Sequence, residues 1–307
     1  MEETQARRTD FDSALTAALP YTPHLDLVVT ISFLGEGVGL HCLLPAMAAL
    51  PVVPPMASTT RLKLGLVLLL LGTALCSSDT AAQTPPATSV LVFSETNGYR
   101  HAAIPDGIEA VRELGAEHGF RVTATEDSTA FRPDRLDAVD VVVFMNTSGD
   151  VLGPAGQDAL RTFIQNGGGY VGVHAASDTE FDWPWYGRLV GAYFDGHPEI
   201  QDATVRVEAP STPSTRMLPE AWMRRDEWYN FDANPRDPVQ VLLTLDESTY
   251  EGGTMGDDHP IAWKHEFDGG RAWYTAGGHT KASYEASLFR QHLLGGLRWA
   301  AGVAKAE

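Results

Sequence analysis

From Ser89 onward, short apolar runs alternate with longer amphipathic stretches. Val90–Phe93 contains no polar residue, which is typical of a strand buried on both faces of a sheet. After Pro105, a residue that suits the first turn of a helix, the apolar residues Ile108, Val111 and Leu114 recur at helical spacing. The elements predicted in this half are strands at Val90–Phe93, Phe120–Thr125, Val139–Met145 and Tyr170–Val173, and helices that open at Pro105 and Pro154.

This alternation of strands and helices predicts a parallel sheet with helices on both faces. The second half of the chain is richer in strand patterns, and a closing helix is expected from about Tyr284 to Ala301. No internal repeat interrupts the pattern, so we predict one α/β domain with added strands in its second half. Those added strands are predicted at Thr204–Glu208, Val239–Leu245, Ile261–Phe267 and Arg271–Thr275.

The first 88 residues follow a different pattern. Arg61 and Lys63 precede an apolar run, Leu64–Leu75, whose length suits a secretory signal peptide better than a transmembrane helix. We therefore predict translation from Met56, cleavage near Ala82 and export to the periplasm or beyond, with a retained membrane anchor as the alternative. The predicted division of the chain is a mis-called or disordered leader at 1–55, a signal peptide at 56–82, a linker at 83–88 and the domain at 89–302.

Charge and cysteine content exclude several classes of function. The formal net charge of −18 argues against a nucleic-acid-binding protein, which needs a basic surface for phosphates. The two cysteines, Cys42 and Cys76, both precede the predicted domain. Cysteine nucleophiles, thiolate zinc sites and internal disulfides are therefore excluded in the domain. Its chemistry has to come from histidine, carboxylate, hydroxyl or backbone groups.

Histidines follow three of the predicted strands. In open α/β sheets, ligands bind beyond the carboxyl ends of the strands. His174 directly follows strand Tyr170–Val173, and small residues two positions before and after it suit a tight turn that lifts the central side chain into a cleft. His279 follows the last predicted strand and two glycines, and His101 ends the loop after the first strand. We expect these three histidines to converge, although a structural hydrogen-bonding role is the alternative for each.

The segment Asp226–Tyr229 combines carboxylates with aromatic rings, which suits carbohydrate recognition, and an amphipathic strand with core aromatics is the alternative. Histidines and carboxylates are also ligand types that a divalent metal accepts, but no local spacing such as HxxxH supports one. His197 is a further candidate for the site, whereas His259 is expected in a surface loop. The predicted acid–base residues or metal ligands are His174, His279, Glu227 and Asp226, and the predicted substrate-binding residues are Tyr99, Arg100, His101, Trp228 and Tyr229.

The sequence resembles the ThuA-like (trehalose utilisation) family along nearly all of Val90–Gly302. The resemblance implies the fold of the class I glutamine amidotransferase-like superfamily, a flavodoxin-like parallel sheet flanked by helices with added strands in the second half. Amidotransferases carry a cysteine where this chain has His174, and imidazole cannot form the thioester that glutamine hydrolysis needs. The segments that match the family are Gly98–His101, Gly167–His174, Asp226–Tyr229, His259–Trp263, Gly278–Thr280 and Leu297–Ala300.

We therefore predict an exported ThuA-like protein that binds and transforms a sugar or sugar derivative, by histidine-based acid–base chemistry or with help from a metal. A non-catalytic carbohydrate-binding or accessory module is the alternative. The expected partner is a small-molecule carbohydrate, and no cofactor is indicated apart from a divalent metal. The sequence leaves the substrate, the reaction and the oligomeric state open, a homo-oligomer included.

Overall fold

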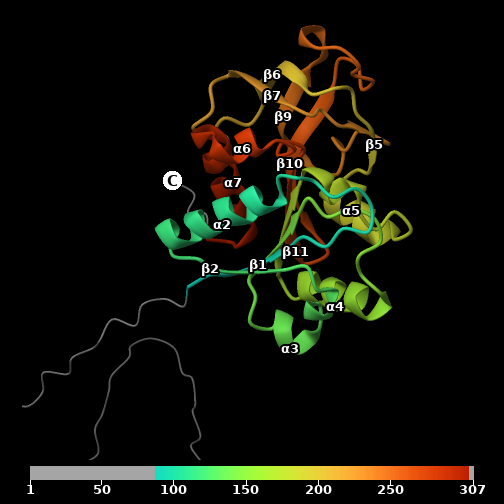
Figure 1. Cartoon of the computed structure of the whole chain (residues 1–307), viewed down its shortest axis with the longest axis vertical. Coiled ribbons are helices and arrows are strands. Elements are labelled where there is room, and N and C mark those ends of the chain that lie inside the picture. Colours follow the sequence, from blue (N-terminus) through green and yellow to red (C-terminus); the bar gives the residue numbers. More distant parts are fainter. Residues whose placement is uncertain (1–86, 304–307) are drawn as a thin grey trace, which may run out of the picture. The chain divides into compact units, whose positions relative to one another are not determined.

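The computed structural model describes residues 87–303 (Figure 1). The predicted leader and signal peptide, and most of the linker at 83–88, therefore lie outside the described residues. Within residues 87–303, no helix is both long and apolar enough to cross a membrane.

A nine-stranded sheet forms the centre of the described domain, in the order β2-β1-β3-β4-β11-β10-β9-β6-β7. The first five strands are parallel in the flavodoxin-like order, and the last four extend the sheet with antiparallel pairs. The predicted flavodoxin-like α/β fold with added strands is therefore confirmed. The strands are β1 Ser89–Phe93, β2 Arg121–Thr125, β3 Val141–Met145, β4 Gly169–Val173, β6 Gln201–Val207, β7 Ala221–Asp226, β9 Gln240–Asp246, β10 His259–Phe267 and β11 Gly270–Thr275.

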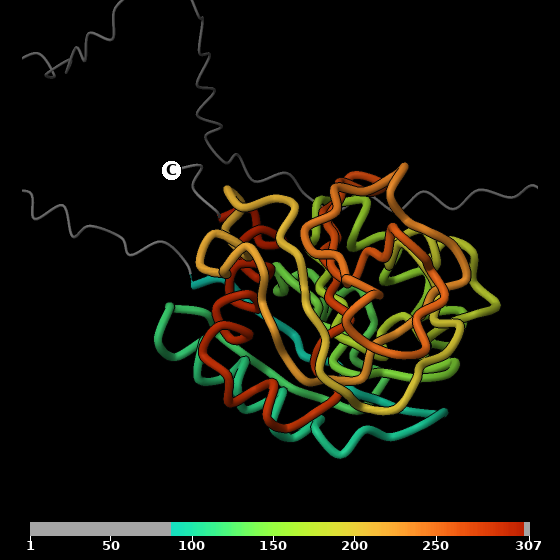
Figure 2. The backbone as a smooth tube through the Cα atoms, turned by 90° about the horizontal axis from the view of Figure 1, so that it is seen from above, coloured from blue at the N-terminus to red at the C-terminus, as the bar shows by residue number. Residues whose placement is uncertain are grey.

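Helices cover both faces of the parallel half of the sheet (Figure 1). On one face α2 packs against both C-terminal helices, which lie beside it when the molecule is viewed from above (Figure 2). On the other face α4 and α5 contact β11, and α3 packs against α4. The helices are α2 Ile104–His118, α3 Pro133–Leu136, α4 Pro154–Gln165, α5 Pro184–Val190, α6 Lys281–Glu285 and α7 Ser287–Ala300.

The core lies between these layers and follows from the apolar runs of the sequence. All five residues of β3 are fully buried, as expected for a strand covered on both faces. Phe93, Phe131 and Phe144 pack edge to face, with ring centroids 4.7 to 5.7 Å apart. Because β1, β3, β4 and β11 run parallel, their carboxyl ends form one edge of the sheet, and the loops beyond this edge carry the candidate site.

Several elements differ from the sequence-based expectation. Strand β7 and a small second sheet, formed by β5 (Phe194–Gly196) and β8 (Asn230–Phe231), were not predicted. The predicted closing helix is divided at Ala286, whose backbone is extended, into α6 and α7. The expectation that His259 lies in a surface loop is wrong: it begins β10 and is fully buried. The side chain of His259 can be buried because both ring nitrogens have polar partners. Nε2 lies 2.8 Å from the carbonyl oxygen of Tyr229, and Nδ1 lies 2.8 Å from Glu247 Oε1.

Candidate functional site

The chain turns sharply where β4 meets a short 3-10 helix, η2 (His174–Asp178). His174 has a φ of 49°, a left-handed conformation that costs a residue other than glycine about 1 kcal/mol or more. Its carbonyl oxygen accepts hydrogen bonds from the hydroxyls of Tyr274 (2.8 Å) and Ser177 (3.3 Å), and its Nδ1 lies 2.7 Å from the carbonyl oxygen of Ala276. These contacts hold the strained turn, so the imidazole is rigidly placed. The sharp turn that the sequence predicts at this residue is present, with a 3-10 helix after it.

A second loop carries His279 beyond the end of β11. Gly278 in this loop has a φ of 114°, which residues with a side chain rarely adopt. The backbone N–H groups of residues 278–280 donate to the carboxylate of Asp226 over 2.9, 3.2 and 3.3 Å. The guanidinium of Arg224 donates to the same carboxylate at 2.6 Å. Asp226 therefore positions the loop that presents His279.

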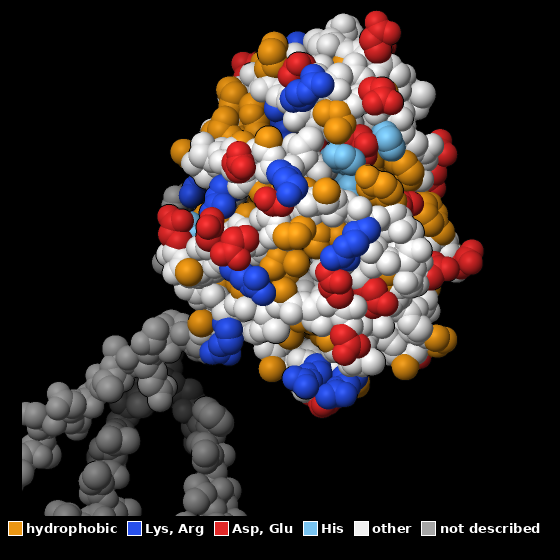
Figure 3. Space-filling view, in the orientation of Figure 1, with side chains coloured by type: hydrophobic (Ala, Val, Ile, Leu, Met, Phe, Trp, Pro, Cys, Tyr) orange, Lys and Arg blue, Asp and Glu red, His pale blue; other side chains and the backbone are white. Residues whose placement is uncertain are grey.

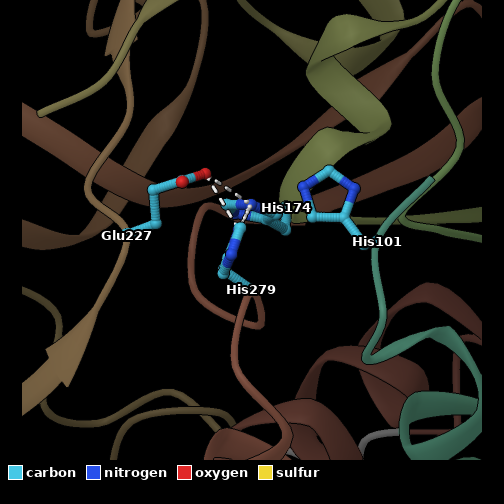
Figure 4. Close-up of side chains that lie close together, drawn as sticks. All are labelled: His101, His174, Glu227 and His279. Atoms are coloured by element: carbon cyan, nitrogen blue, oxygen red, sulfur yellow. Dashed lines mark hydrogen bonds and ion pairs between the residues drawn. The ribbon is translucent and has the colours of Figure 1, made fainter. Parts of the chain in front are cut away.

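Glu227 directly follows β7 and extends into the space between the two histidines (Figure 4). Its Oε2 lies 2.9 Å from Nδ1 of His279 and 3.4 Å from Nε2 of His174. The two histidine nitrogens are 3.2 Å apart. Three side chains that are far apart in the sequence thus bring their polar atoms together at one point.

His101 completes the cluster from the loop between β1 and α2 (Figure 4). Its ring centroid lies 4.9 Å from that of His174 and 5.0 Å from that of His279, with the rings nearly perpendicular. The side chain is buried, and its Nδ1 has no hydrogen-bond partner within residues 87–303. A buried nitrogen without a partner costs about 1–3 kcal/mol, which marks His101 as a residue kept for a role other than stability.

Two further side chains surround this cluster. The Nδ1 of His197 lies 3.2 Å from the second carboxylate oxygen of Glu227, Oε1, and the His197 side chain is 41% exposed. The ring of Tyr229 lies against that of His174, with centroids 4.0 Å apart. Histidine side chains are visible at the surface among acidic and hydrophobic ones (Figure 3). The cluster is thus walled by an aromatic ring on one side and reaches solvent on another.

Burial and mutual charge set the protonation of the cluster. Burial on its own would raise the pKa of the Glu227 carboxyl, but hydrogen bonds and charge from His174 and His279 outweigh it and hold this pKa well below its usual range. Burial, together with the nearby His174 and His279, lowers the pKa of His101 to about 3, and burial is the largest of these causes. At neutral pH the cluster therefore contains a carboxylate anion and a neutral imidazole.

The structure separates the predicted site residues into two groups. His174, His279, Glu227 and His101 meet in the cluster, and Tyr229 contacts it. Tyr99, which is 66% exposed, lies at the edge of the cluster beside His101. The others point elsewhere. Asp226 supports the His279 loop, the Arg100 guanidinium pairs with Glu126 at 2.6 Å, and the indole N–H of Trp228 donates to the backbone of Gln201.

Asp178, at the end of η2, is a carboxyl group near the site that the sequence analysis did not single out. Burial raises its pKa to about 6, and its charge acts on the phenol of Tyr229. A carboxyl group that is still partly protonated near neutral pH is able to act as an acid. The sequence position of Asp178, shortly after the end of a predicted strand and after His174, could have identified it as a site residue, because residues beyond strand ends line such sites.

Both the sequence and the fold are similar to those of known proteins. A family model described as ThuA, trehalose utilisation, matches residues 89–300. The solved structure of a ThuA-like protein from Bacteroides uniformis ATCC 8492 superposes with a TM-score of 0.60 at 25% identity, covering 70% of this chain and 91% of that protein. A ThuA-like protein from Parabacteroides merdae ATCC 43184 superposes with a TM-score of 0.58 at 20% identity, covering 70% and 90%. No match was found among curated proteins.

Proposed function

Because the chain belongs to the ThuA (trehalose utilisation) family, we propose that it is an exported protein that binds and transforms a sugar or sugar derivative at His174, Glu227 and His279. One observation carries this proposal: polar atoms of these three side chains, from distant segments, lie 2.9 to 3.4 Å from one another at the carboxyl edge of the sheet. Burying charged and polar groups together costs free energy, so such a cluster is a functional-site signature. The family description, trehalose utilisation, is the reason for proposing a sugar as the substrate. The signal-peptide pattern at residues 56–82 is the reason for proposing export.

His279 is the member of the cluster best placed to touch the substrate. Its side chain is 18% exposed, against 8% for Glu227 and 0% for His174. With a proton on Nδ1, His279 donates to the Glu227 carboxylate, and its Nε2 carries the lone pair of a general base. Glu227 then stabilises the imidazolium that forms when His279 accepts a proton. The proton would come from a sugar hydroxyl or from a carbon next to a sugar carbonyl.

Tyr99 and His101 support a sugar as the substrate. The exposed ring of Tyr99 lies edge-on to His101, with centroids 4.8 Å apart. An exposed aromatic ring offers an apolar surface to the C–H face of a pyranose, and the unpartnered nitrogen of His101 offers a hydrogen bond to a hydroxyl. The same features suit the alternative, a carbohydrate-binding module without turnover.

Turnover of a sugar panel tests the proposal. The panel contains trehalose, other disaccharides and their oxidised derivatives, and NMR spectra of each sugar report its conversion. We expect His279→Ala to lower kcat/KM by about 10²- to 10⁴-fold, the usual contribution of a general base. His118→Ala, a matched histidine at the end of α2, should leave turnover unchanged.

Binding measurements by calorimetry separate the two functions. Conversion of a sugar by the wild type that His279→Ala abolishes supports an enzyme. Binding without conversion by the wild type means that the chain is a binding module. If no sugar in the panel is bound or converted, or if His279→Ala behaves like the wild type, the proposed function is wrong.

A further inference from the structure

Three atoms of the cluster form a nearly equilateral triangle. The distances are 2.9 Å from Glu227 Oε2 to His279 Nδ1, 3.2 Å between the two histidine nitrogens, and 3.4 Å from His174 Nε2 to Glu227 Oε2. Ligand atoms that lie 2.0–2.1 Å from one tetrahedral ion are about 3.3 Å apart. A single hydrogen bond explains one short distance, whereas a shared centre explains all three.

The tautomer of His174 suits a ligand. Its Nδ1 lies 2.7 Å from the backbone carbonyl oxygen of Ala276, which only accepts hydrogen bonds. The neutral ring therefore carries its proton on Nδ1, and the lone pair of Nε2 is directed at the triangle. Metal-bound histidines characteristically donate their second ring N–H to a carbonyl or carboxylate, which fixes the tautomer and the ring orientation.

Glu227 is held in a matching way. Its Oε2 belongs to the triangle, while its Oε1 lies 3.2 Å from Nδ1 of His197. Ligating carboxylates are usually hydrogen-bonded through such outer groups. His197 therefore acts as a positioning residue for the carboxylate.

His101 faces the remaining side of the triangle. One of its ring nitrogens lies within 4.8 Å of each of the three atoms, and no hydrogen bond or ion pair joins the His101 side chain to them (Figure 4). Its buried Nδ1 has no partner among the described residues. His101 is therefore placed to hydrogen-bond a group that occupies the fourth coordination position of an ion.

We propose that His174, Glu227 and His279 bind a divalent transition-metal ion such as Zn²⁺, with His101 beside an open fourth position. Two imidazoles and one carboxylate with an open position form a catalytic type of zinc site. Mg²⁺ and Ca²⁺ prefer oxygen ligands, so the two nitrogens favour a transition metal. The binding of the ion stands on this geometry, and the ion would take the place of the proton on His279 Nδ1, so that the His279–Glu227 hydrogen bond belongs to the metal-free protein. The role of the ion rests on the proposed function: it would polarise a carbonyl or hydroxyl oxygen of the sugar.

Metal binding to the full chain tests the inference. After treatment with a chelator, the wild type should take up one equivalent of Zn²⁺ by calorimetry and elemental analysis, and Co²⁺ should give the intense visible bands of a four-coordinate nitrogen–oxygen site. Glu227→Gln and His279→Ala should each weaken binding at least about 100-fold, and His197→Ala about 10- to 100-fold. His101→Ala should weaken it less than any of these, and His118→Ala should not change it. Circular dichroism should show that every variant is folded.

The outcomes distinguish this inference from the proposed function. Stoichiometric binding that is lost in the Glu227 and His279 variants supports the metal site, even if no sugar is converted. A wild type that binds no Zn²⁺ or Co²⁺, or folded variants that bind as tightly as the wild type, overturns the metal site. Sugar conversion by a metal-stripped protein would then leave the proposed function standing with acid–base chemistry alone.

Discussion

Asp226 and Glu227 are consecutive carboxylates with different surroundings. Asp226 is fully buried and accepts hydrogen bonds from Arg224, from the hydroxyl of Ser283 (2.8 Å) and from the backbone of the His279 loop. The carboxylate oxygens of Asp226 are therefore occupied by hydrogen bonds from the protein. Among the described residues, the Glu227 carboxylate pairs only with histidine side chains, which are able to release a proton or share a metal ion. At the scale of the residue, we therefore propose Asp226 as a positioning group and Glu227 as the reactive one.

Asp226→Asn should therefore be strongly destabilising. The Arg224 side chain is only 10% exposed, and removing the charge of its partner leaves a buried cation uncompensated, at a cost of about 3–5 kcal/mol. Urea denaturation measures the change in the free energy of unfolding. Asp202→Asn is the matched control, because Asp202 pairs with Arg225 at the surface, where such a pair contributes about 0–1 kcal/mol. Equal effects of the two substitutions would contradict the assignment of Asp226.

At the scale of the element, two turns at neighbouring strand ends carry the catalytic candidates. The turn after β4 stores strain at His174, and the turn after β11 depends on the backbone freedom of Gly278. Strands β4 and β11 are hydrogen-bonded neighbours, so both turns rest on the same rigid part of the sheet. The distance between the two imidazoles is therefore set by strand pairing together with two unusual backbone conformations.

Gly278→Ala should disturb both stability and the site. A Cβ at this position would lie 2.8 Å from the hydroxyl oxygen of Tyr284 and 3.0 Å from Cγ1 of Val173, on a backbone that alanine rarely adopts. We expect a loss of about 2 kcal/mol or more, together with lower sugar turnover because His279 is displaced.

Gly156→Ala in helix α4 is the matched control for this change. A Cβ there meets only ordinary contacts of 3.4 Å or more, and alanine favours helix, so a gain of about 0.4–1 kcal/mol is expected. Thermal denaturation and turnover assays report both effects. A Gly278→Ala protein as stable and as active as the wild type would show that the loop conformation is not required.

At the scale of the whole molecule, His292 in α7 connects distant parts of the domain. Its Nδ1 donates to the backbone carbonyl of Ser214 at 2.7 Å, and its Nε2 lies 3.3 Å from the hydroxyl oxygen of Thr275 in β11. Burial lowers the pKa of His292 to about 4, from an ordinary value of 6.5. The folded protein thus contains this ring in its neutral form, bridging a helix, a strand and a loop.

This burial predicts a loss of stability in acid. Because the unfolded chain binds the proton more tightly, the contribution of His292 is fully present above pH 6.5 and is lost as the pH falls toward 4, by on the order of 3 kcal/mol. His292→Gln, which removes the titrating ring, should lack this part of the pH dependence. Urea denaturation of both proteins from pH 4 to 8 measures it. A stability difference between them that stays constant across this range would contradict the prediction.

The sequence was sufficient for much of the fold and for part of the site. Apolar runs located β1, β3 and β4, because strands covered on both faces contain almost only apolar residues. Strand β7 was missed, because half of its residues are exposed and it carries two arginines. The burial of His259 was also missed, since the groups that hydrogen-bond its ring are 30 residues away, at Tyr229, and 12 residues away, at Glu247 in a short 3-10 helix.

By itself, the sequence determined that His101, His174 and His279 follow parallel strands, and the parallel arrangement then required them to share one edge of the sheet. Only the tertiary structure decided which side chains join them. In the segment between β7 and β8, Glu227 and Tyr229 reach the cluster while Trp228, between them, packs in the core. The position of this segment depends on four antiparallel strands that extend the sheet, and such long-range pairing leaves no local pattern in the sequence.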